Sequence, residues 1–473
     1  MQENRFKYEA IADNIRDAIR LGSLRTGDRL QSIRQTSREL GVSNASVFKA
    51  YYHLESEGLI ECRPKSGYYV RYHLQDSQPP SCQLLNEDAC EVSNQALIQE
   101  FLATKLAHPD HLDLSTAVPS TELLPIAGLK KSIQKSYLND PRAATAYENT
   151  TGHSGLKRSI CQFGLNWGSV IAENEVVITN GCMEAIALSL SILTEPGDTI
   201  ALESPVYYGL LQLIQHLKLK IVEIPADPTT GISLDDLEQV IHHQDLKAIL
   251  VIPNFNNPTG SLVPDENKQR LVAMATEHQI PIIEDDIYGE LYFSEPRPKN
   301  CKSFDEDGWV IYCSSFSKTL VPGFRVGWCI PGRFHEEFVQ RKYVTNISTS
   351  SISQAVIAHF LTHGRYDFYL KKLRSALKTQ HLQYKRAIFD YFPGKIASSN
   401  PQGGFVLWLE LPKNKNALKL YQAGVKASIV IAPGQMFFAR ADYKNYFRIS
   451  FGKPFDEAVD QALKKLGSLA ATL

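Results

Sequence analysis

One stretch of the chain reads Ser314-Ser315-Phe316-Ser317-Lys318-Thr319-Leu320 and continues as Val321-Pro322-Gly323-Phe324-Arg325. A lysine amine can form a Schiff base with an aldehyde cofactor, and serine hydroxyls together with an arginine can hold a phosphate. The stretch therefore predicts pyridoxal 5'-phosphate (PLP) on Lys318, with its phosphate on Ser315, Ser317 and Arg325. Taken alone, the same pattern also fits a solvated surface lysine, so the flanking sequence must decide between the two interpretations.

Short apolar strands alternate with amphipathic helices from about residue 110 onward. The clearest strands lie at 175–179, 199–202, 247–252, 281–284 and, directly before the lysine stretch, 309–312. Near-continuous apolar strands separated by helices indicate an α/β fold with a mostly parallel central sheet covered on both faces. Ligands of such sheets bind beyond the carboxyl ends of the strands, so strand-end residues are the candidates for a site.

Four earlier strand ends carry groups that a PLP ring needs. Gly181 opens a helix whose backbone N–H groups can hold a phosphate, and Tyr207 can stack on a flat ring. The side-chain amide of Asn257 can hydrogen-bond a phenolate oxygen. Asp285 can keep a pyridine nitrogen protonated, which makes the ring an electron sink, and Tyr288 can share the ring oxygen.

Each of these groups also has a plainer interpretation. Gly181 fits an ordinary strand-to-helix turn, Tyr207 fits a core tyrosine, and Asn257 fits a bare Asn-Pro-Thr-Gly turn. The adjacent acids Asp285 and Asp286 could instead bind a metal, but no histidine or third carboxylate lies at metal-ligand spacing. Five consecutive strand ends, each with a suitable group, favour PLP over this set of separate explanations.

The order of these motifs resembles the fold-type I aminotransferases. The matching elements are Gly-x-x-x-Ala, an aromatic residue, Asn-Pro-Thr-Gly, Asp-x-x-Tyr, Ser-x-Ser-Lys and a following arginine, and they extend from roughly residue 110 to the C-terminus. The resemblance implies that Lys318 holds PLP as an imine and that Asp285 pairs with the pyridine nitrogen. It also implies that Asn257 and Tyr288 reach the ring oxygen. The expected catalytic residues are Lys318, Asp285 and Tyr288.

The same resemblance assigns the surroundings of the cofactor. Tyr207 would stack on the ring, and the phosphate would be surrounded by Gly181, Cys182, Met183, Ser315, Ser317 and Arg325. Tyr147 would reach the phosphate of a neighbouring subunit, and Arg448 would grip a substrate α-carboxylate in bidentate fashion. Many members have a small or polar residue and then Gln where this chain has Cys182-Met183. Backbone N–H groups are expected to serve there in place of one side-chain contact.

The first seventy residues carry a different pattern. Apolar positions at helical spacing predict helices at 8–21, 32–40 and 44–57, with a tight turn at 41–43 between the second and the third. Two β-prone runs then flank Arg63-Pro64-Lys65-Ser66-Gly67, which predicts a hairpin with a basic tip. This order is that of a winged helix-turn-helix, an α+β unit. The alternative is a small helical protein-interaction domain.

This segment resembles the GntR-type winged-helix family in the runs Gly27-Asp28-Arg29-Leu30, Arg38-Glu39-Leu40-Gly41-Val42-Ser43 and Ser66-Gly67-Tyr68-Tyr69-Val70. The resemblance implies that DNA meets Arg34, Ser43, Asn44, Ser46 and Lys49, together with Lys65, Ser66 and Gly67 of the wing. Residues 1–74 hold 12 Lys/Arg against 9 Asp/Glu, a net charge of +3 that suits a phosphate backbone. Gln31 stands where the family usually has proline, which we expect to loosen the entry to the second helix.

The predicted domains are a winged helix at 1–74, a linker at 75–95 and a PLP-binding domain at 96–473. The linker is rich in Gln, Ser, Asp and Glu, contains Pro79-Pro80 and shows no periodicity, which predicts a mobile tether. Within the third unit we expect a large subdomain at about 130–350 and a smaller α+β subdomain at about 365–473.

The whole chain has the composition of a soluble globular protein. Its 473 residues are 43% hydrophobic and 21% charged, with a net charge of -1. Eight cysteines without a C-x-x-C pair predict free thiols in a reducing compartment and no metal site. The N-terminus has no apolar signal region and no apolar run approaches membrane-spanning length, so we expect a cytoplasmic protein without a membrane partner.

A GntR-type winged helix followed by a fold-type I aminotransferase domain resembles the MocR family of transcription regulators. The resemblance implies a homodimer that binds a double-stranded DNA operator, with PLP as cofactor and an amino compound or amino acid reacting at the Lys318 imine as effector. The alternative is a working aminotransferase, converting an amino acid to a 2-oxo acid, that carries an accessory DNA-binding domain. The winged helix favours the regulator, because a plain aminotransferase has no use for it.

Overall fold

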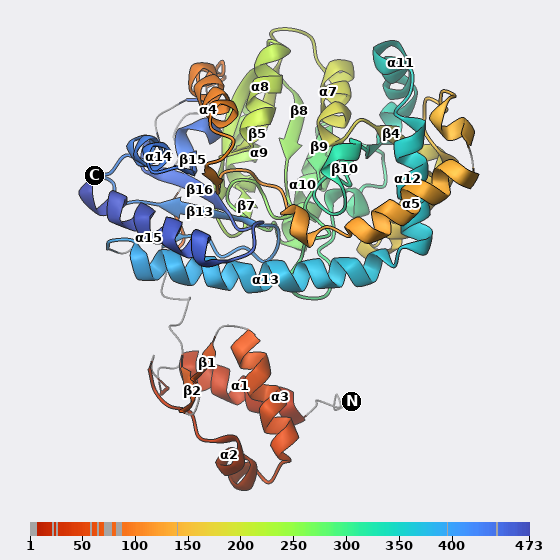
Figure 1. Ribbon diagram of the computed structural model, residues 1–473. Coiled ribbons are helices and arrows are strands. Elements are labelled where there is room, and N and C mark those ends of the chain that lie inside the picture. The colour runs from red at the N-terminus through yellow and green to blue at the C-terminus, as the bar shows by residue number, and fades with distance from the viewer. Residues whose placement is uncertain are drawn as a thin grey trace.

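The computed structural model describes residues 7–473 except 21–22, 25–26, 57–58, 64–65, 71–77, 82–87, 140, 395 and 441–442. The chain forms a small N-terminal unit, a large body around a central sheet, and a C-terminal subdomain beside that sheet (Figure 1). No helix in these described ranges is both long and apolar enough to cross a membrane.

The N-terminal unit is the predicted winged helix. It contains α1 (Lys7–Arg20), α2 (Ile33–Leu40), α3 (Asn44–Ser56), β1 (Ile60–Arg63) and β2 (Gly67–Val70), and the two strands pair antiparallel. Ser32 caps α2 by accepting the Gln35 N–H, and Gly41 ends the helix in the left-handed region at a φ of 61°. The core contains Val47, Tyr51 and Leu54, which share one face of α3. The Tyr51 hydroxyl donates to the Gln31 carbonyl and so fixes the entry to α2.

The described parts of the linker, 78–81 and 88–94, lie against the C-terminal body. Ser81 N–H donates to Glu410, and the side-chain amide of Asn94 donates to two backbone carbonyls, those of Met436 and Phe438. Cys90 forms an isolated bridge with Ile221. No local sequence pattern indicates these contacts, because their partners lie more than a hundred residues away in the sequence.

The large body contains an eight-stranded sheet in the order β4-β11-β10-β9-β8-β5-β6-β7. Five neighbouring strands are parallel: β10 (Val310–Ser315), β9 (Ile282–Asp285), β8 (Leu246–Val251), β5 (Thr199–Ser204) and β6 (Lys220–Asp227). Two others run antiparallel to their neighbours: β11 (Gly327–Ile330), between β10 and β4 (Val177–Thr179), and β7 (Gly231–Ile232) at the far edge. The mostly parallel sheet confirms the predicted α/β class.

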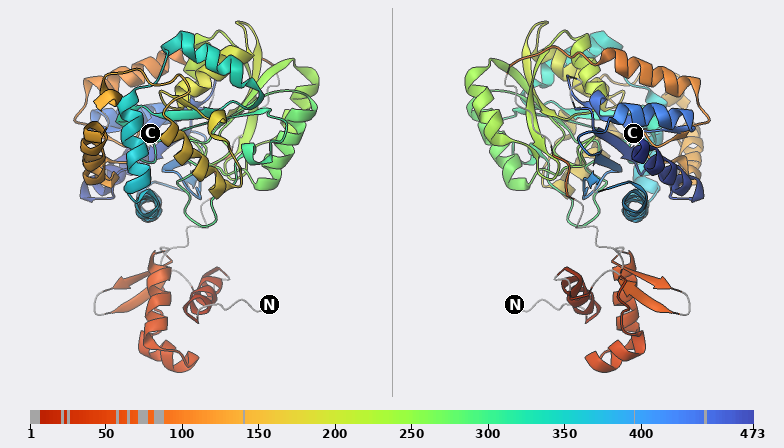
Figure 2. Two further views of the ribbon diagram at one scale, coloured as in Figure 1. Left: turned by 90° about the vertical axis from the view of Figure 1, so that its right-hand side faces the viewer. Right: turned by 90° about the vertical axis from the view of Figure 1, so that its left-hand side faces the viewer.

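Helices cover both faces of this sheet (Figure 2). Successive residues of one strand point into two separate hydrophobic clusters, as Ile249 and Leu250 do. The helices of the large body are α5 (Ile126–Asn139), α6 (Ser154–Gly164), α7 (Cys182–Leu193), α8 (Tyr208–His216), α9 (Leu234–His243), α10 (Asp265–Glu277), α11 (His335–Asn346) and α12 (Ser351–His363). Because both faces are buried, the strand ends are what remains accessible to a ligand.

The C-terminal subdomain is built on a four-stranded antiparallel sheet of β12 (Ala397–Ser398), β13 (Val406–Glu410), β16 (Tyr446–Ser450) and β15 (Ala432–Pro433). Around it lie α4 (Gln95–Ala107), α14 (Ala417–Lys426) and α15 (Glu457–Thr472), and β14 (Ile429–Val430) pairs with β3 (Leu112–Asp113). The long helix α13 (Tyr366–Tyr391) runs beneath both subdomains on the side of the winged helix (Figure 1).

Candidate functional site

A cleft with about 930 Å³ of empty space, part of it open to solvent, lies at the carboxyl ends of the parallel strands. Ten of the predicted site residues line it: Cys182, Met183, Tyr207, Asn257, Asp285, Tyr288, Ser317, Lys318, Arg325 and Arg448. They come from separate strand ends and, in the case of Arg448, from β16 of the C-terminal subdomain. The fold therefore brings most of the predicted cofactor set to one place.

Lys318 enters the cleft from the turn that follows β10. The Ser315 hydroxyl accepts the Ser317 N–H at 3.2 Å, which shapes this turn, and the Lys318 amine donates to the Ala117 carbonyl at 2.6 Å. Burial in the cleft, assisted by the positive charge of Arg448, lowers the pKa of Lys318 to about 8. A substantial share of this amine is therefore neutral near pH 8, which is the form that can bond to an aldehyde carbon.

Asp285 is buried at the end of β9. The Cys182 thiol and the Ile287 N–H each donate to its Oδ1 at 3.2 Å. Burial raises the pKa of Asp285 to about 6. A nearby cation would stabilise the charged form of this buried carboxyl group, and a protonated ring nitrogen would be such a cation. Cys182, which departs from the aminotransferase pattern, thus contacts the carboxylate through its side chain.

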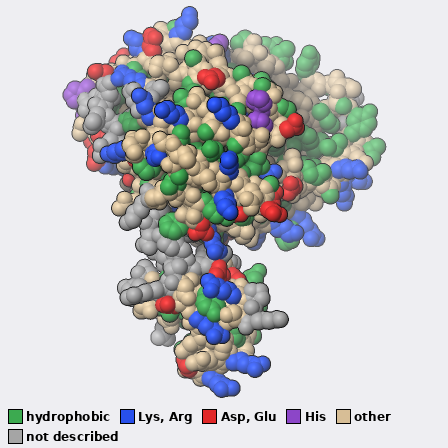
Figure 3. All heavy atoms as spheres, turned by 60° about the vertical axis from the view of Figure 1, so that its left-hand side comes forward, with side chains coloured by type: hydrophobic (Ala, Val, Ile, Leu, Met, Phe, Trp, Pro, Cys, Tyr) green, Lys and Arg blue, Asp and Glu red, His purple; other side chains and the backbone are tan. Residues whose placement is uncertain are grey.

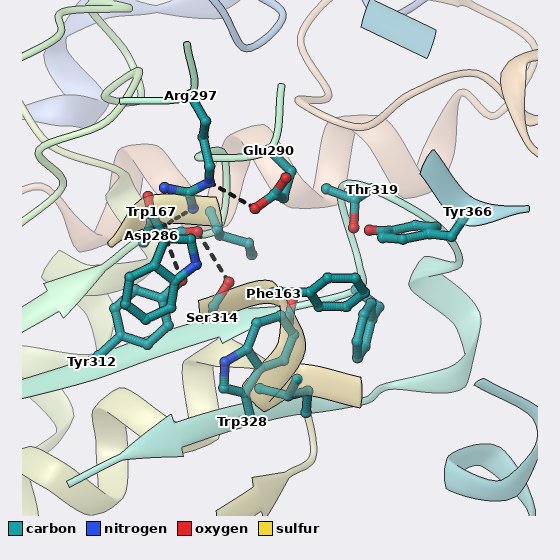
Figure 4. Close-up of a pocket in the computed structure, with 14 residues that line it drawn as sticks. Phe163, Trp167, Asp286, Glu290, Arg297, Tyr312, Ser314, Thr319, Trp328 and Tyr366 are labelled. Atoms are coloured by element: carbon teal, nitrogen blue, oxygen red, sulfur yellow. Dashed lines mark hydrogen bonds and ion pairs between the residues drawn. The ribbon is translucent and has the colours of Figure 1, made fainter. Parts of the chain in front are cut away.

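The neighbouring Asp286 belongs to a buried polar network behind the cleft (Figure 4). Its carboxylate accepts from Arg297 at 2.6 Å, from Asn254 at 2.8 Å and from the Tyr312 hydroxyl at 2.9 Å. Arg297 also pairs with Glu290 at 2.7 Å. The described residues contain no group of three or more His, Cys, Asp or Glu side chains that could hold a metal ion. Asp286 anchors the strand end that carries Asp285.

Three side chains form a hydrogen-bonded row across the cleft. The Asn257 amide donates to the Tyr288 hydroxyl at 3.2 Å, and Arg448 donates to the Asn257 carbonyl oxygen at 2.5 Å. A second Arg448 nitrogen donates to the Ser115 carbonyl, while its Nε has no partner among the described residues. Burial lowers the pKa of Arg448 and raises that of Tyr288. A buried guanidinium with spare donor capacity is suited to a carboxylate ligand.

The turn between β4 and α7 forms a cradle for an anion. Gly181 is the N-cap of α7 at a φ of 88°, and a Cβ there would collide with the Arg325 guanidinium. Arg325 donates to the Ser317 hydroxyl at 3.1 Å and to the Asn180 carbonyl at 3.2 Å. A phosphate requires hydrogen-bond donors, and this turn offers helix N–H groups, a hydroxyl and a guanidinium. The missing Cβ of Gly181 leaves the space between them open.

Two predicted cofactor residues stand apart from this arrangement. Ser315 is buried and lines the small cavity behind the cleft instead, and its hydroxyl accepts the Ser317 N–H of the lysine turn. Tyr147 is 84% exposed and does not line the cleft of its own chain. Gly181 borders the cleft through its contact with Arg325.

The cleft also contains residues that sequence reasoning missed. Tyr208, Thr116, Ala117 and Val118 line it, and Lys105 reaches it from α4. The Lys105 amine pairs with Asp113 at 2.8 Å and donates to the Thr116 hydroxyl. No local pattern marks these residues, because α4 and the segment 113–118 meet the cleft only through the tertiary fold.

The predicted DNA-contacting residues lie mainly on the surface of the winged helix. Arg34, Ser43, Asn44 and Lys49 are exposed and Ser46 is half-buried. The Ser43 hydroxyl accepts the Ser46 N–H at 3.1 Å and so caps the start of α3. In the wing, Ser66 and Gly67 are half-buried at the turn into β2, whereas Lys65 lies outside the described residues.

Comparison with known proteins matches both parts of the chain. Residues 109–466 match a family model described as aminotransferase class I and II, and residues 7–70 match one described as bacterial regulatory proteins, gntR family. The chain is 34% identical over 465 residues to an uncharacterized HTH-type transcriptional regulator, YjiR, of Escherichia coli (strain K12), with 98% of each chain covered. It is 28% identical to the HTH-type transcriptional regulator NorG of Staphylococcus aureus (strain USA300), with 93% of this chain and 98% of NorG covered.

Among solved structures, the fold matches LysN, the α-aminoadipate aminotransferase of Thermus thermophilus, complexed with N-(5'-phosphopyridoxyl)-L-leucine. The TM-score is 0.73 at 27% identity, with 79% of this chain and 94% of LysN covered.

Proposed function

This chain belongs to the family of regulators that join a GntR-type winged helix to a class I and II aminotransferase domain, and from this premise we propose that an amino compound in the Lys318 cleft sets its affinity for operator DNA. The observation that carries the proposal is the convergence of Lys318, Asp285 and Arg448 on one cleft in a chain that also has a folded winged helix. The cofactor implied by the aminotransferase fold is PLP.

We assign the cofactor contacts from the donors present in the cleft. When bound, PLP supplies an aldehyde that condenses with amines and a ring that withdraws electrons. Lys318 would hold it covalently, Asp285 would accept from the ring nitrogen, and the Asn257–Tyr288 pair would bind the ring oxygen. Tyr207 would cover the ring, and the Gly181 turn with Ser317 and Arg325 would bind the phosphate. Each assignment rests on the chemistry of the side chain and on its position along the cleft.

We assign the effector class from Arg448. Its guanidinium is buried, lies at the cleft and has an unpartnered Nε among the described residues. A carboxylate could replace the Ser115 carbonyl at the guanidinium with a stronger, charge-assisted pair. An amine is needed to react at the Lys318 end. An amino acid meets both requirements, and the leucine conjugate bound to LysN is consistent with this class.

The segment 113–118 offers a route from the cleft to the linker. It supplies the carbonyls that contact Lys318 and Arg448, and Lys105 ties it to α4. Helix α4 follows directly on the linker, whose residue Asn94 is anchored on the C-terminal subdomain. A ligand that displaces the Ser115 carbonyl would therefore bias the position of α4. A ligand changes the state of a protein only through such differential contacts.

We further propose that the protein acts as a homodimer. Tyr147 is exposed on its own chain, where it cannot serve its own cleft. Large apolar side chains are also exposed on α5, shortly before Tyr147 in the sequence, and at the end of α11: Ile133, Tyr137, Leu138, Tyr343, Val344 and Ile347. Apolar surface of this kind is commonly covered by a partner.

The test uses the full-length protein reconstituted with PLP. We would record its visible absorption during titration with a panel of amino acids and amines, and in parallel its affinity for a DNA site selected from a random pool. We expect one ligand to change both the spectrum and the DNA affinity, with no such response in Lys318→Ala. An Arg448→Lys variant keeps the positive charge but loses the bidentate guanidinium. It should need a roughly tenfold higher concentration of that ligand for the same response.

Three results would change the proposal. Binding of no DNA sequence above the non-specific level would remove the regulatory function. A spectrum without a Lys318-dependent band would remove the cofactor. Steady conversion of an amino acid to its 2-oxo acid, with DNA affinity unchanged, would make the chain an aminotransferase with an accessory domain.

A further inference from the structure

The outward face of α3 carries two exposed aromatic side chains. Val47, Ala50, Tyr51 and Leu54 point into the core of the winged helix, and the opposite face presents Ala45, Phe48, Lys49 and Tyr52. Phe48 is 53% exposed and Tyr52 is 63% exposed. Their rings lie 6.4 Å apart at an interplanar angle of 20°, a stacked pair one helical turn apart. Among the described residues, neither ring belongs to the hydrophobic core of the winged helix.

Exposed cationic side chains lie on α3 and on the helix before it. Lys49 is exposed on α3, with its amine 4.0 Å from the centroid of the Tyr8 ring, and Arg34 and Arg38 are exposed on α2. Basic side chains are visible at the lower end of the winged helix, at the height of α2 in Figure 1 (Figure 3). Apolar rings accompanied by cationic side chains are complementary to a DNA groove, where phosphates flank the base edges. They are a poor match for a basic or wholly apolar protein surface.

The chemistry of the major groove limits what an exposed phenylalanine can contact there. Base edges in that groove present hydrogen-bond donors and acceptors, and the single apolar group among them is the C5-methyl of thymine. In helix-turn-helix proteins the N-terminal residues of the second helix contact base edges. Phe48 lies near the start of α3 and has no polar atom, so its ring can gain free energy only against such a methyl group.

We propose that Phe48 reads thymine in the operator by packing on its C5-methyl group, with the Tyr52 ring holding Phe48 in position. This inference rests on the proposed DNA-binding function and names one feature of the recognised sequence. Tyr52, one turn further from the start of the helix, directs its hydroxyl toward the sugar-phosphate backbone. Arg34 and Lys49 supply sequence-independent contacts to phosphates on either side of the pair.

The test begins with the DNA site that the full-length wild-type protein selects from a random pool. Each thymine of that site is then replaced by uracil, which removes the methyl group and leaves the hydrogen-bonding edges unchanged. We expect one or two positions at which uracil weakens wild-type binding by about 3- to 5-fold, the effect of one buried methyl group. Phe48→Ala should bind the thymine site about tenfold more weakly and show no further loss with uracil.

Two matched variants control for other effects. Phe48→Leu keeps an apolar contact, so replacing thymine by uracil should still weaken its DNA binding, but by less than in the wild type. Phe368→Ala removes a ring of similar exposure, 56%, from α13 and should leave DNA binding unchanged.

Wild-type binding that is equally strong with uracil at every position would overturn the inference while leaving DNA recognition intact, and this measurement needs no variant to fold. A wild-type protein that selects no DNA would overturn both proposals. If Phe48→Ala changes the oligomeric state and not the DNA affinity, the aromatic pair is a protein-docking surface and the inference is wrong.

Discussion

Protonation of the residues around the cleft depends strongly on burial. The pKa of Asp285 is raised to about 6 and that of Lys318 is lowered to about 8, in both cases mainly because a charged group is removed from water. A third case, Glu203, lies at the end of β5 and is fully buried, and burial raises its pKa to about 8. One of its oxygens accepts the Ile252 N–H and the other has no partner among the described residues.

Glu203 leads to a prediction about stability and pH. Because its folded-state pKa lies above the unfolded value of 4.5, folding favours the protonated form, and the free energy of unfolding falls as pH rises from about 4.5 to about 8. Glu203→Gln removes this titration. We expect the variant to gain about 4 kcal/mol over the wild type between pH 5 and pH 8.5, as measured by denaturant unfolding at both pH values. The exposed Glu277→Gln is the control, and parallel curves for wild type and Glu203→Gln would contradict the prediction.

At the scale of single residues, the sequence could predict what each strand end supplies but not what each side chain touches. The sequence marks Asn257, Asp285 and Lys318 as candidates because each follows a recognisable strand. The contact between Cys182 and Asp285 was not found, since it joins residues 103 positions apart. No sequence motif surrounds Lys105 or Thr116, and these residues reach the cleft only through the packing of α4.

At the scale of elements, helices were easier to predict than strand directions. The three N-terminal helices follow from apolar spacing together with a capping serine at 32 and a glycine at 41. The antiparallel strand β11, inserted between β10 and β4, could not be predicted in the same way. Its direction is set by pairing with distant strands, and Val326-Gly327-Trp328 carries no local signal of that direction.

The second prediction concerns α4 and the segment 113–118. Lys105→Met removes the ion pair with Asp113 and the hydrogen bond to Thr116, which are the ties between the two elements. We expect the amino-acid ligand still to change the visible spectrum, while its effect on DNA affinity falls by about 5- to 10-fold, or about 1 kcal/mol of coupling. The measurement is DNA affinity with and without saturating ligand.

The matched variant for this experiment is Lys419→Met, which removes an exposed lysine from α14. It should leave both the spectrum and the coupling unchanged. If Lys105→Met kept the full effect of ligand on DNA affinity, the signal would travel by another route.

At the scale of the whole molecule, the exposed position of Tyr147 predicts that each PLP site of a dimer contains residues from both subunits. Tyr147→Ala and Lys318→Ala homodimers should each bind PLP roughly tenfold more weakly than the wild type, because one loses a phosphate contact and the other the covalent link. Mixed heterodimers should recover one intact site out of two, with Lys318 from one chain and Tyr147 from the other. The measurement is the visible band after subunit mixing, and no recovery would mean that Tyr147 does not act across the boundary.

The winged helix folds around a hydrophobic cluster of its own, which among the residues that the structure describes shares none with the two clusters of the large body. The Arg386–Glu61 ion pair, at 3.4 Å and partly exposed, joins the two units at the surface without extending either core. In evolutionary terms, a gene rearrangement that cuts within the linker could attach the same ligand-binding body to a different winged helix without repacking any interior. The choice of operator and the choice of ligand can then diversify independently, and a new regulatory circuit can arise by recombination alone.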